Sequence, residues 1–531
     1  MEAKTEKITI DRKKAVFLMT VLFGFLAHGF RLTNKFYCDD SWNYMWTISR
    51  GWTVAIGRFF LPLVETFRGN YETTWVIGVF SIFCIALAAV LIVELFDIKG
   101  NVGWALTAAL LVVNPVITGT FAYMYTADGY FFGMMCSVLS AFLVIRVKGW
   151  KGLAGGAAAL FVAMGLYQSY ISVTILLLML WLLLMLLDPE KKAKELFAQA
   201  GRFLGMGVAA MAAYLIGMNV AWKIDDTQMA DYMGMSDAGG YSVQRLVGAV
   251  RSSYVEFARF FLVRWEPNFY NVSNVILLLS IVVLLLRICL KRKVFAQPWR
   301  IALMILWALL LPLITHIYSF VSEGVSYISI IMCYSMVLIW LMPLILWQEA
   351  ECDTGSFAQW CQVEYVKKHL CQTLQSVLLI CICVHFAVIA DQAYERMHLA
   401  NEQIRNLVNR IQYRMELVEG YTDTCEVALY GNLYQAPEYV PSAPMMPGVV
   451  SGLYLATQRD FSSAIDWYAS SRHQWATADR RKELVRNPEF AQMKVWPAEE
   501  CVRRIDGTIV ILLADDEADE FGKTIKDYLE E

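Results

Sequence analysis

Long apolar segments recur along the chain, and most of them are separated by only short polar connections. About eleven are apolar enough, over a window of about 19 residues, to cross a membrane. They lie at 14–32, 75–96, 102–121, 128–146, 153–170, 171–187, 203–222, 272–290, 300–321, 327–347 and 371–391. A single segment of this length crosses a bilayer as a helix, because a helix satisfies its own backbone hydrogen bonds. The pattern therefore predicts a polytopic α-helical membrane protein.

Basic residues between the segments indicate how the chain is oriented. They precede the first segment, follow the fourth, sixth and eighth, and precede the last; they are residues 12–14, Arg146, Lys148, Lys151, Lys191, Lys192, Lys194, 291–293 and 367–368. All of them fall on one side, which the positive-inside rule makes cytoplasmic. We therefore expect a multi-pass membrane protein with a cytoplasmic N-terminus and an exported C-terminal segment. Residues 33–74 and 223–271 then form two large external loops.

The C-terminal part has a different pattern. Residues 1–392 hold every apolar segment and are expected to form the transmembrane domain, whereas residues 393–531 are expected to form a small extracytoplasmic α+β domain. A charged helical run at 393–419 precedes a strand at 425–430 that ends at Gly431. Residues 502–513 are typical of a β-hairpin around the turn Asp506-Gly507.

Composition and charge narrow the function. The chain has 58% hydrophobic and 18% charged residues, fewer charges than the roughly 25% of soluble domains. Residues 393–531 hold 23 acidic and 15 basic residues, so this part carries −8 and the remainder +5 of the net −3. An acidic exported domain argues against binding nucleic acid or an anionic lipid surface.

Most of the 12 cysteines lie in apolar or cytoplasmic segments, where they act as small apolar residues. Cys38, Cys425 and Cys501 are predicted outside, and a disulfide between Cys425 and Cys501 is one possibility. The cysteines show no metal-like spacing, and we expect neither a metal nor a cofactor.

The first external loop carries the main candidates for catalysis, Asp39 and Asp40, about six residues after the first apolar segment. The positions 42, 45, 46, 49, 52, 53 and 56 follow a helical spacing and are mostly apolar. The pattern predicts two short helices on the outer membrane surface. An aspartate before a helix is an ordinary N-cap, and a carboxylate in a partly dry site is also a general base. Adjacent helical residues point about 100° apart, so the functional interpretation makes one aspartate the base and the other a cap.

The motifs of this loop resemble a known family. Asp39-Asp40, Arg50-Gly51-Trp52 and Gly57-Arg58-Phe59-Phe60 are similar to the bacterial serotype-converting glucosyl transferases, the Gtr type II family of the GT-C superfamily. The likeness is best over roughly 25–175 and fades through the eighth to tenth segments; the C-terminal part with its hairpin also resembles that family.

The resemblance implies a hexosyltransferase that uses a polyprenyl (undecaprenyl) phosphate sugar, with glucose as the sugar. It implies an acidic residue of the first external loop as the base, and a cell-envelope glycan such as O-antigen or teichoic acid as the acceptor. A glycosyltransferase that makes the donor and a flippase that exports it would be its partners.

The donor phosphate needs a cation, and Arg58 is the leading candidate because a guanidinium binds a phosphate bidentately. A pair between Arg58 and Glu65, or snorkelling of Arg58 to the membrane surface, is the alternative. Lys223, Arg245 and Arg251 of the second external loop are further candidates. Side chains for the sugar or acceptor are expected at other external ends; they are Tyr125, Asp128, Tyr167, Gln168, His316 and Glu323. Aromatic residues at these positions are also typical of the interfacial belt.

Two other classes of function remain open. A transporter, flippase or polymerase of lipid-linked glycans would also be polytopic, but transporters place ionisable residues near the bilayer midplane. Here the segment centres are nearly free of charge and polar residues gather at the external ends. A non-catalytic assembly subunit with the acidic tail as a binding module is the third hypothesis.

Overall fold

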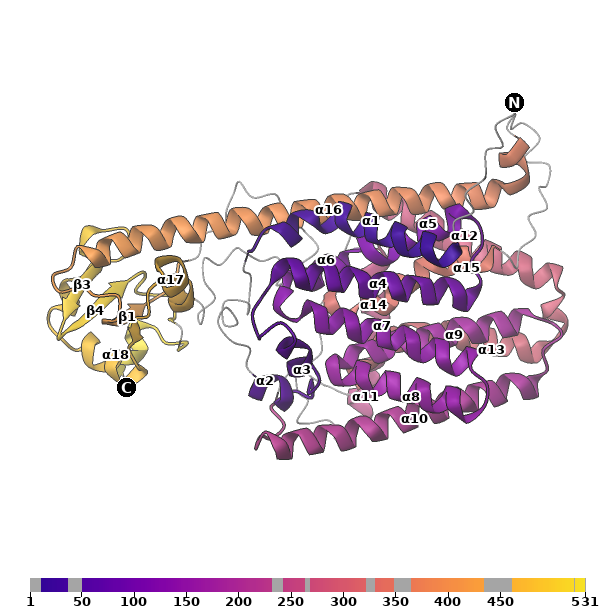
Figure 1. The fold of residues 1–531 in the computed structure, drawn as a ribbon, viewed down its shortest axis with the longest axis horizontal. Helices are drawn as coiled ribbons and strands as arrows, with labels where there is room; N and C mark the ends of the chain where they lie inside the picture. The colour runs from indigo at the N-terminus through magenta and orange to yellow at the C-terminus, as the bar shows by residue number, and fades with distance from the viewer. Residues whose placement is uncertain are drawn as a thin grey trace, which may run out of the picture. The chain divides into compact units, whose positions relative to one another are not determined.

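The computed structural model describes residues 11–36, 50–231, 242–262, 268–320, 330–347, 364–433, 461–519 and 521–530. Asp39, Asp40, Cys38 and Glu323 lie outside these residues. The chain divides into two compact units, one of Met1–Asn34 and Ser49–Asp391 and the other of Lys35–Ile48 and Gln392–Glu531 (Figure 1).

The described part of the first unit is helical. Its long helices are α1 (Arg12–Thr33), α4 (Thr74–Phe96), α5 (Asn101–Val113), α7 (Met124–Arg146), α8 (Gly149–Leu166), α9 (Ile171–Leu187), α10 (Ala193–Ile224), α11 (Val243–Leu262), α12 (Asn268–Lys291) and α13 (Pro298–Thr315). Its short elements are α2 (Arg50–Ala55), α3 (Leu61–Thr66), α6 (Pro115–Ala122), η2 (Gln168–Tyr170), η4 (Val294–Ala296), η5 (Ile317–Phe320), η6 (Ile330–Met332), α14 (Tyr334–Val337), η7 (Leu338–Leu341) and α15 (Met342–Leu346). Helix α16 (Glu364–Glu416) begins in the first unit and ends in the second.

Ten helical segments of the described residues are long and apolar enough to cross a membrane. The chain is therefore a polytopic α-helical membrane protein, as the sequence predicts. The tenth predicted segment, 327–347, differs: its described part consists of the short elements η6, α14, η7 and α15. The third segment is divided at Asn114-Pro115, because proline donates no backbone hydrogen bond. The Asn114 side chain caps α6 by accepting from the amides of Val116 and Ile117.

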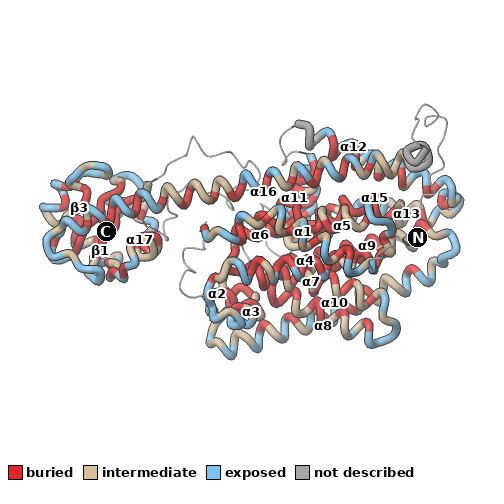
Figure 2. Tube along the Cα trace, turned by 45° about the horizontal axis from the view of Figure 1, so that its top comes forward, coloured by how far each residue is buried: buried red, intermediate tan, exposed pale blue. Residues whose placement is uncertain are grey.

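Helices of the first unit are apolar on two sides. In α10 the buried residues Phe203, Met206 and Tyr214 face the neighbouring helices. A second set recurs at helical spacing on the exposed side, namely Leu204, Val208, Met211 and Leu215. Figure 2 shows buried residues alternating with exposed ones along the helices. An exposed apolar stripe of this length is typical of a surface in contact with lipid tails rather than water.

Arginines neutralise helix ends on the side that the sequence makes cytoplasmic. Arg146 donates to the carbonyls of Glu94 and Leu95 at the end of α4, at 2.8 and 2.7 Å. Arg300, which is buried, donates to the carbonyl of Leu186 at the end of α9, at 2.7 Å. A cation at a helix C-terminus satisfies carbonyls that lack an intrahelical partner and interacts favourably with the helix dipole. These basic residues therefore have a structural function besides any influence on orientation.

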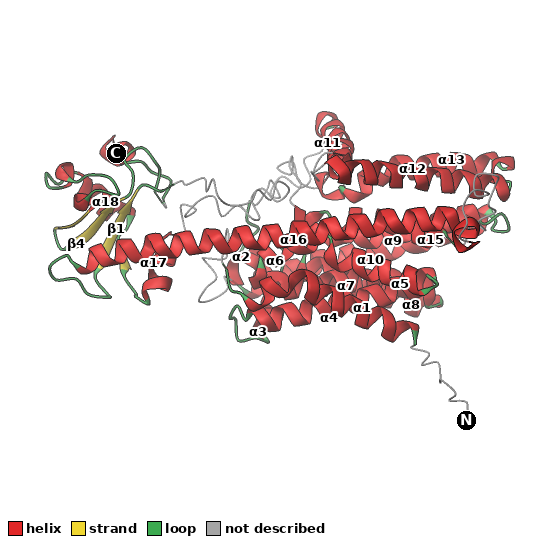
Figure 3. Ribbon diagram, turned by 90° about the horizontal axis from the view of Figure 1, so that it is seen from above, coloured by secondary structure: helices red, strands yellow, loops and turns green. Residues whose placement is uncertain are grey.

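The second unit contains the strands of the described chain (Figure 3), arranged as a sheet of order β2-β1-β4-β3. The strands are β1 (Glu426–Tyr430), β2 (Gln474–Trp475), β3 (Val502–Ile505) and β4 (Thr508–Leu512). β1 is parallel to β2 and β4, and β3 is antiparallel to β4. The predicted hairpin is confirmed: Asp506 and Gly507 both have positive φ, as a tight two-residue turn requires. The predicted strand before Gly431 is confirmed as β1.

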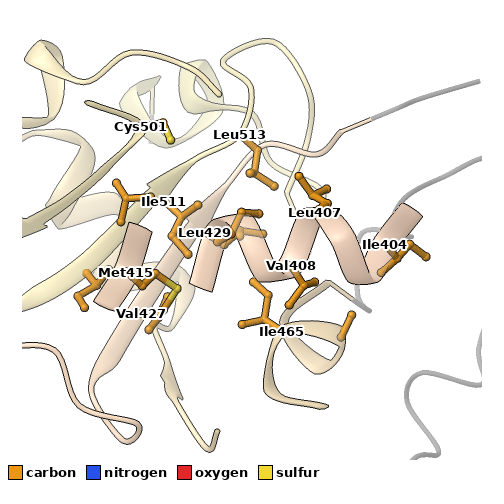
Figure 4. Close-up of a cluster of buried hydrophobic side chains, with 14 residues drawn as sticks. Ile404, Leu407, Val408, Met415, Val427, Leu429, Ile465, Cys501, Ile511 and Leu513 are labelled. Carbon is orange, nitrogen blue, oxygen red and sulfur yellow. The ribbon is translucent and has the colours of Figure 1, made fainter. Parts of the chain in front are cut away.

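Helices cover both faces of this sheet. One face of β1 and β4 packs against α16 and α17 (Phe461–Ala469), and Figure 4 shows Leu407 and Val408 of α16 close to Leu429 and Ile511 of the strands. The other face packs against α18 (Ala478–Val485), η9 (Phe490–Gln492) and α19 (Ile525–Glu530). Alternate residues of a strand point to opposite faces, so a strand covered on both sides is apolar throughout. All four residues from Val427 to Tyr430 are buried.

The disulfide considered between Cys425 and Cys501 is not formed, and both thiols are free. The strand register gives the reason. Cys425 precedes β1 at the level of Gly507, whereas Cys501 precedes β3 at the level of Leu512, the opposite end of β4. Five residues of strand separate the two levels by about 16 Å, far more than the roughly 7 Å that a disulfide spans. The Cys501 sulfur instead accepts a hydrogen bond from Arg414 at 2.9 Å.

Candidate active site

The described part of the loop between α1 and α4 contains the two short helices α2 and α3, as predicted. Figure 1 shows both at one end of the helices of the first unit. The end of α10 holds α2 there: Trp222 donates to the carbonyl of Val54 at 3.0 Å, and Arg50 pairs with Asp225 at 2.9 Å. The loop is therefore packed on the helix bundle.

Between α2 and α3 the chain turns sharply at Gly57-Arg58. Gly57 has φ +79°, a conformation that glycine adopts without strain. The Gln168 side chain donates to the carbonyl of Ile56 at 2.7 Å, and the Tyr214 hydroxyl donates to the carbonyl of Gly57 at 3.2 Å. Gln168 also donates to the Tyr214 hydroxyl at 3.1 Å. The turn is thus held by η2 and α10, so the backbone of Arg58 has a fixed position.

This packing predicts that Gly57→Ala will destabilise the protein. A Cβ at position 57 would lie 2.4 Å from the Tyr214 hydroxyl, and the left-handed backbone costs an L-residue roughly 1–2 kcal/mol. Gly51→Ala is the matched control, because Gly51 lies in α2 with no heavy atom within 4 Å of the added carbon. Thermal unfolding in detergent should give a lower Tm for Gly57→Ala and an equal or higher one for Gly51→Ala. Equal midpoints for both variants would contradict the strained turn.

The Arg58 side chain lies among tyrosines. It donates to the Tyr130 hydroxyl at 2.7 Å, and its guanidinium carbon lies 4.9 Å from the centre of the Tyr167 ring. The rings of Tyr130 and Tyr167 stack with their centres 4.5 Å apart. A guanidinium over aromatic faces is held by cation–π attraction. The structure therefore brings together the predicted residues Arg58, Tyr167 and Gln168.

Tyr130 and Tyr214 belong to this group and were not predicted. Both lie within apolar helices, α7 and α10, where a tyrosine is ordinary. Their contacts with Arg58 and Gly57 join residues 72 and 157 positions apart. The local sequence around each tyrosine holds no signal for such a pairing.

A buried cluster of charges lies after the turn. Arg68 pairs with Asp128 at 2.9 Å, and its guanidinium also lies 3.9 Å from a carboxylate oxygen of Glu65. Arg68 donates further to the carbonyls of Tyr71 and Tyr125. The three side chains are 4%, 1% and 8% exposed for Arg68, Glu65 and Asp128. Asp128 thus has a partner inside the protein, and Glu65 pairs with Arg68.

Glu65 interacts less strongly with Arg68 than Asp128 does, because its carboxylate lies 3.9 Å from the guanidinium and that of Asp128 lies 2.9 Å from it. Burial raises the pKa of Glu65 to about 8, with Arg68 lowering it and the Asp128 charge raising it further. The folded state therefore binds a proton that the unfolded chain has already lost above about pH 4.5. A carboxyl group shifted in this direction makes the folded state less stable as pH rises from about 4.5 to about 8.

We therefore expect Glu65→Gln to reduce the loss of stability between pH 5 and pH 8, because glutamine keeps the neutral shape without titrating. The measurement is Tm as a function of pH. Glu190→Gln, at an exposed position in the loop after α9, is the control and should leave the wild-type profile unchanged. A Glu65→Gln profile parallel to that of the wild type would show that Glu65 is charged throughout.

The other predicted residues lie at two places. Lys223 is exposed in the last turn of α10, one residue after the tryptophan that contacts α2. Arg245 and Arg251 both lie on α11, but Arg245 is buried and Arg251 is exposed. His316 is buried, with Ser252 of α11 at 3.4 Å and the Tyr318 ring at 4.7 Å. The structure brings His316 next to α11 rather than to Arg58.

The residues around Arg58 and the residues around His316 lie at the same end of the helix bundle. Arg300 at the start of α13 contacts the end of α9, and Trp307 in the middle of α13 donates to the carbonyl of Met179 in the middle of α9, at 2.8 Å. Helix α13 is therefore antiparallel to α9. The end of α13 that carries His316 is then level with η2, which carries Gln168.

The arrangement combines a fixed cation with aromatic rings. A fixed guanidinium with aromatic rings beside it can bind a phosphate oxygen and pack against an apolar or sugar group. Among the residues that the structure describes, no group of three or more His, Cys, Asp or Glu side chains could hold a metal ion.

Comparison with known proteins identifies the family. The model of the family described as glucosyl transferase GtrII matches residues 29–340, more than half of the chain. The match includes the described first loop, the tyrosines around Arg58 and helix α11, so it extends beyond the region of best likeness in the sequence. It ends before residues 392–531, the larger part of the second unit. No curated protein and no solved structure matches the chain. With its polytopic helical fold and this match, the chain belongs to the GtrII family of glucosyl transferases and is a membrane glycosyltransferase.

Proposed function

We propose that the protein transfers glucose from a polyprenyl (undecaprenyl) phosphate to a cell-envelope glycan at the outer face of the bacterial inner membrane. Family membership supports glucosyl transfer in the modification of an envelope glycan. The observation that carries the lipid-linked donor is the Gly57-Arg58 turn, which fixes a guanidinium beside aromatic rings at the end of the helix bundle. A donor with a charged phosphate between a sugar and an apolar tail matches such a cation next to the membrane.

The proposed reaction is a direct displacement. A hydroxyl of the acceptor attacks the anomeric carbon, the bond from that carbon to the phosphate oxygen breaks, and the configuration inverts. Asp39 or Asp40 accepts the hydroxyl proton, and the polyprenyl phosphate leaves with the electron pair. Arg58 stabilises the charge that develops on the phosphate. Lys223, Arg245, Arg251, Tyr125, Asp128, Tyr167, Gln168, His316 and Glu323 stay candidates for further contacts with the donor or acceptor.

The topology proposed with this reaction has the N-terminus in the cytoplasm and the C-terminal domain outside. The end of the bundle that carries Gly57-Arg58 then faces outward. This side is where an exported lipid-linked sugar and an envelope glycan meet.

A transfer assay tests the proposal. The purified protein in lipid nanodiscs is given undecaprenyl phosphate carrying radiolabelled glucose and a lipid-linked envelope glycan, and the label in the glycan is measured. Transfer from the lipid-linked donor is the expected result. Transfer from a nucleotide sugar alone would overturn the donor class. Movement of the labelled lipid across vesicle membranes without transfer would identify a flippase instead.

A further inference from the structure

Helix α11 presents a polar side to the rest of the protein. Five of its six buried residues recur at intervals of three and four, namely Arg245, Ala249, Ser253, Glu256 and Phe260; the sixth, Phe261, lies near its C-terminal end. The Ser253 hydroxyl lies 3.3 Å from that of Ser319, next to the end of α13. Four of these six buried side chains are polar or small. The apolar residues of the helix must therefore lie mostly elsewhere.

An apolar stripe of α11 is exposed beside this buried side. It consists of Val243, Leu246, Val247, Val250 and Tyr254, which are 81%, 40%, 63%, 39% and 39% exposed. Their spacing of three and four residues places them on one side of the helix. In water such a stripe would be unfavourable, whereas in lipid it replaces contacts between acyl chains.

The third side of α11 is polar and exposed. Besides the exposed Val255, it carries Arg251, Gln244 and Arg259, in this order around the helix from the apolar stripe toward the buried side. Arg251 is exposed, and 57% of the Arg259 side chain is exposed although one of its nitrogens binds Glu256 at 2.7 Å. Arginines eight residues apart on a helix lie about 12 Å from each other along its axis.

These three sides do not fit a membrane-spanning helix. Its 20 residues would be long enough, but four of them are charged, and α11 is not among the ten candidate spans of the described chain. Figure 3 shows α11 running across the direction of α12 and α13 rather than along it. Tyr254 donates to the carbonyl of Leu309 at 2.7 Å, so the helix is fixed against the outer part of α13.

We propose that α11 lies in the membrane surface at the end of the bundle that carries Gly57-Arg58, and that Arg251 and Arg259 bind phosphates of the surrounding phospholipids. The apolar stripe continues the lipid-facing surface of the spans it packs on, where Leu279 of α12 and Leu309 of α13 are 60% and 53% exposed. Two separated cations match neighbouring headgroups of a bilayer, whereas one polyprenyl phosphate offers a single phosphate. The inference does not depend on the glucosyl donor.

Anionic lipid should therefore stabilise the protein through these two arginines. The full-length protein is placed in nanodiscs of phosphatidylcholine, with or without phosphatidylglycerol, and its thermal unfolding is measured. We expect a higher Tm with phosphatidylglycerol for the wild type and loss of this increment in the double variant Arg251→Glu/Arg259→Glu. The double variant Arg486→Glu/Lys526→Glu changes the same charge on the second unit and should keep the increment.

Two further measurements separate the alternatives. Polyprenyl phosphate added to phosphatidylcholine nanodiscs should give less of the increment than phosphatidylglycerol; an increment from polyprenyl phosphate alone would make α11 a donor site and overturn the proposal. A photoreactive benzophenone amino acid at Val247 should form adducts with lipid, and the same group at Gln244 should form few. Equal lipid adducts at both positions, or an unchanged increment in the α11 double variant, would also overturn it.

Discussion

Asparagine in place of the proposed base, which is either Asp39 or Asp40, should reduce the rate of glucosyl transfer by roughly 10²–10⁴. This is the usual contribution of a general base. Asparagine keeps the size of aspartate and its ability to cap a helix, but it does not accept the proton at neutral pH. The variant should therefore insert and fold normally and bind the donor. We favour Asp39 as the base, and the other aspartate should tolerate the change.

Asp226→Asn provides the matched control for this experiment. Asp226 is exposed in the loop after α10 and has a positive φ, a conformation that asparagine adopts as readily as aspartate. Its turnover should equal that of the wild type. If Asp39→Asn and Asp40→Asn both kept full turnover with intact donor binding, the two aspartates would be structural and the proposed mechanism would fail.

Arg58→Ala should reduce activity, whereas Arg68→Ala should reduce stability. Arg68 pairs with the buried Asp128 carboxylate, so its removal leaves that charge without its cation and should destabilise the protein by about 3–5 kcal/mol. Arg58 is partly exposed and contacts tyrosines, so its loss should leave the fold largely intact. Loss of charged hydrogen bonds to the donor, of about 1.5–3 kcal/mol, lowers kcat/KM by roughly 10- to 150-fold.

The measurement combines Tm and kcat/KM for each variant. We expect Arg68→Ala to lower Tm strongly, and Arg58→Ala to lower kcat/KM with little change in Tm. Arg58→Lys should recover part of the activity, because lysine keeps the charge but not the bidentate geometry. A lower Tm and unchanged kcat/KM for folded Arg58→Ala would show that Arg58 is a packing residue.

The fold was predictable where the signal is local. Membrane helices follow from apolar length, and the hairpin of β3 and β4 follows from Asp506-Gly507 between two apolar runs. The interruption at Asn114-Pro115 was also readable in principle, because proline rarely continues a helix, but hydropathy averages over such a break. Hydropathy averaging also missed the structure of the tenth segment. Its mean hydropathy is that of a membrane span, but residues 334–346 form short helical elements.

The sequence indicated several residues of the candidate site, but it did not indicate which of them contact one another. Gly57-Arg58 is a recognisable motif, and a glycine before a functional arginine indicates a turn. The partner of Arg68 lies 60 positions away in α7, and the side chain that holds the Gly57 turn lies 112 positions from Ile56. Only the packing of the helices sets such distances. For the same reason the sequence left Glu65 as a partner for Arg58, while the structure gives it to Arg68.

The sheet of the second unit has a consequence for self-association. A strand at a sheet edge offers unpaired backbone groups to other chains and is a starting point for aggregation. Here one edge strand, β2, is only two residues long, and the other, β3, carries Arg503 and Arg504. Short edges and charged edges both disfavour the addition of a foreign strand. In the described part of the sheet, both edges therefore disfavour edge-to-edge joining between copies of the protein.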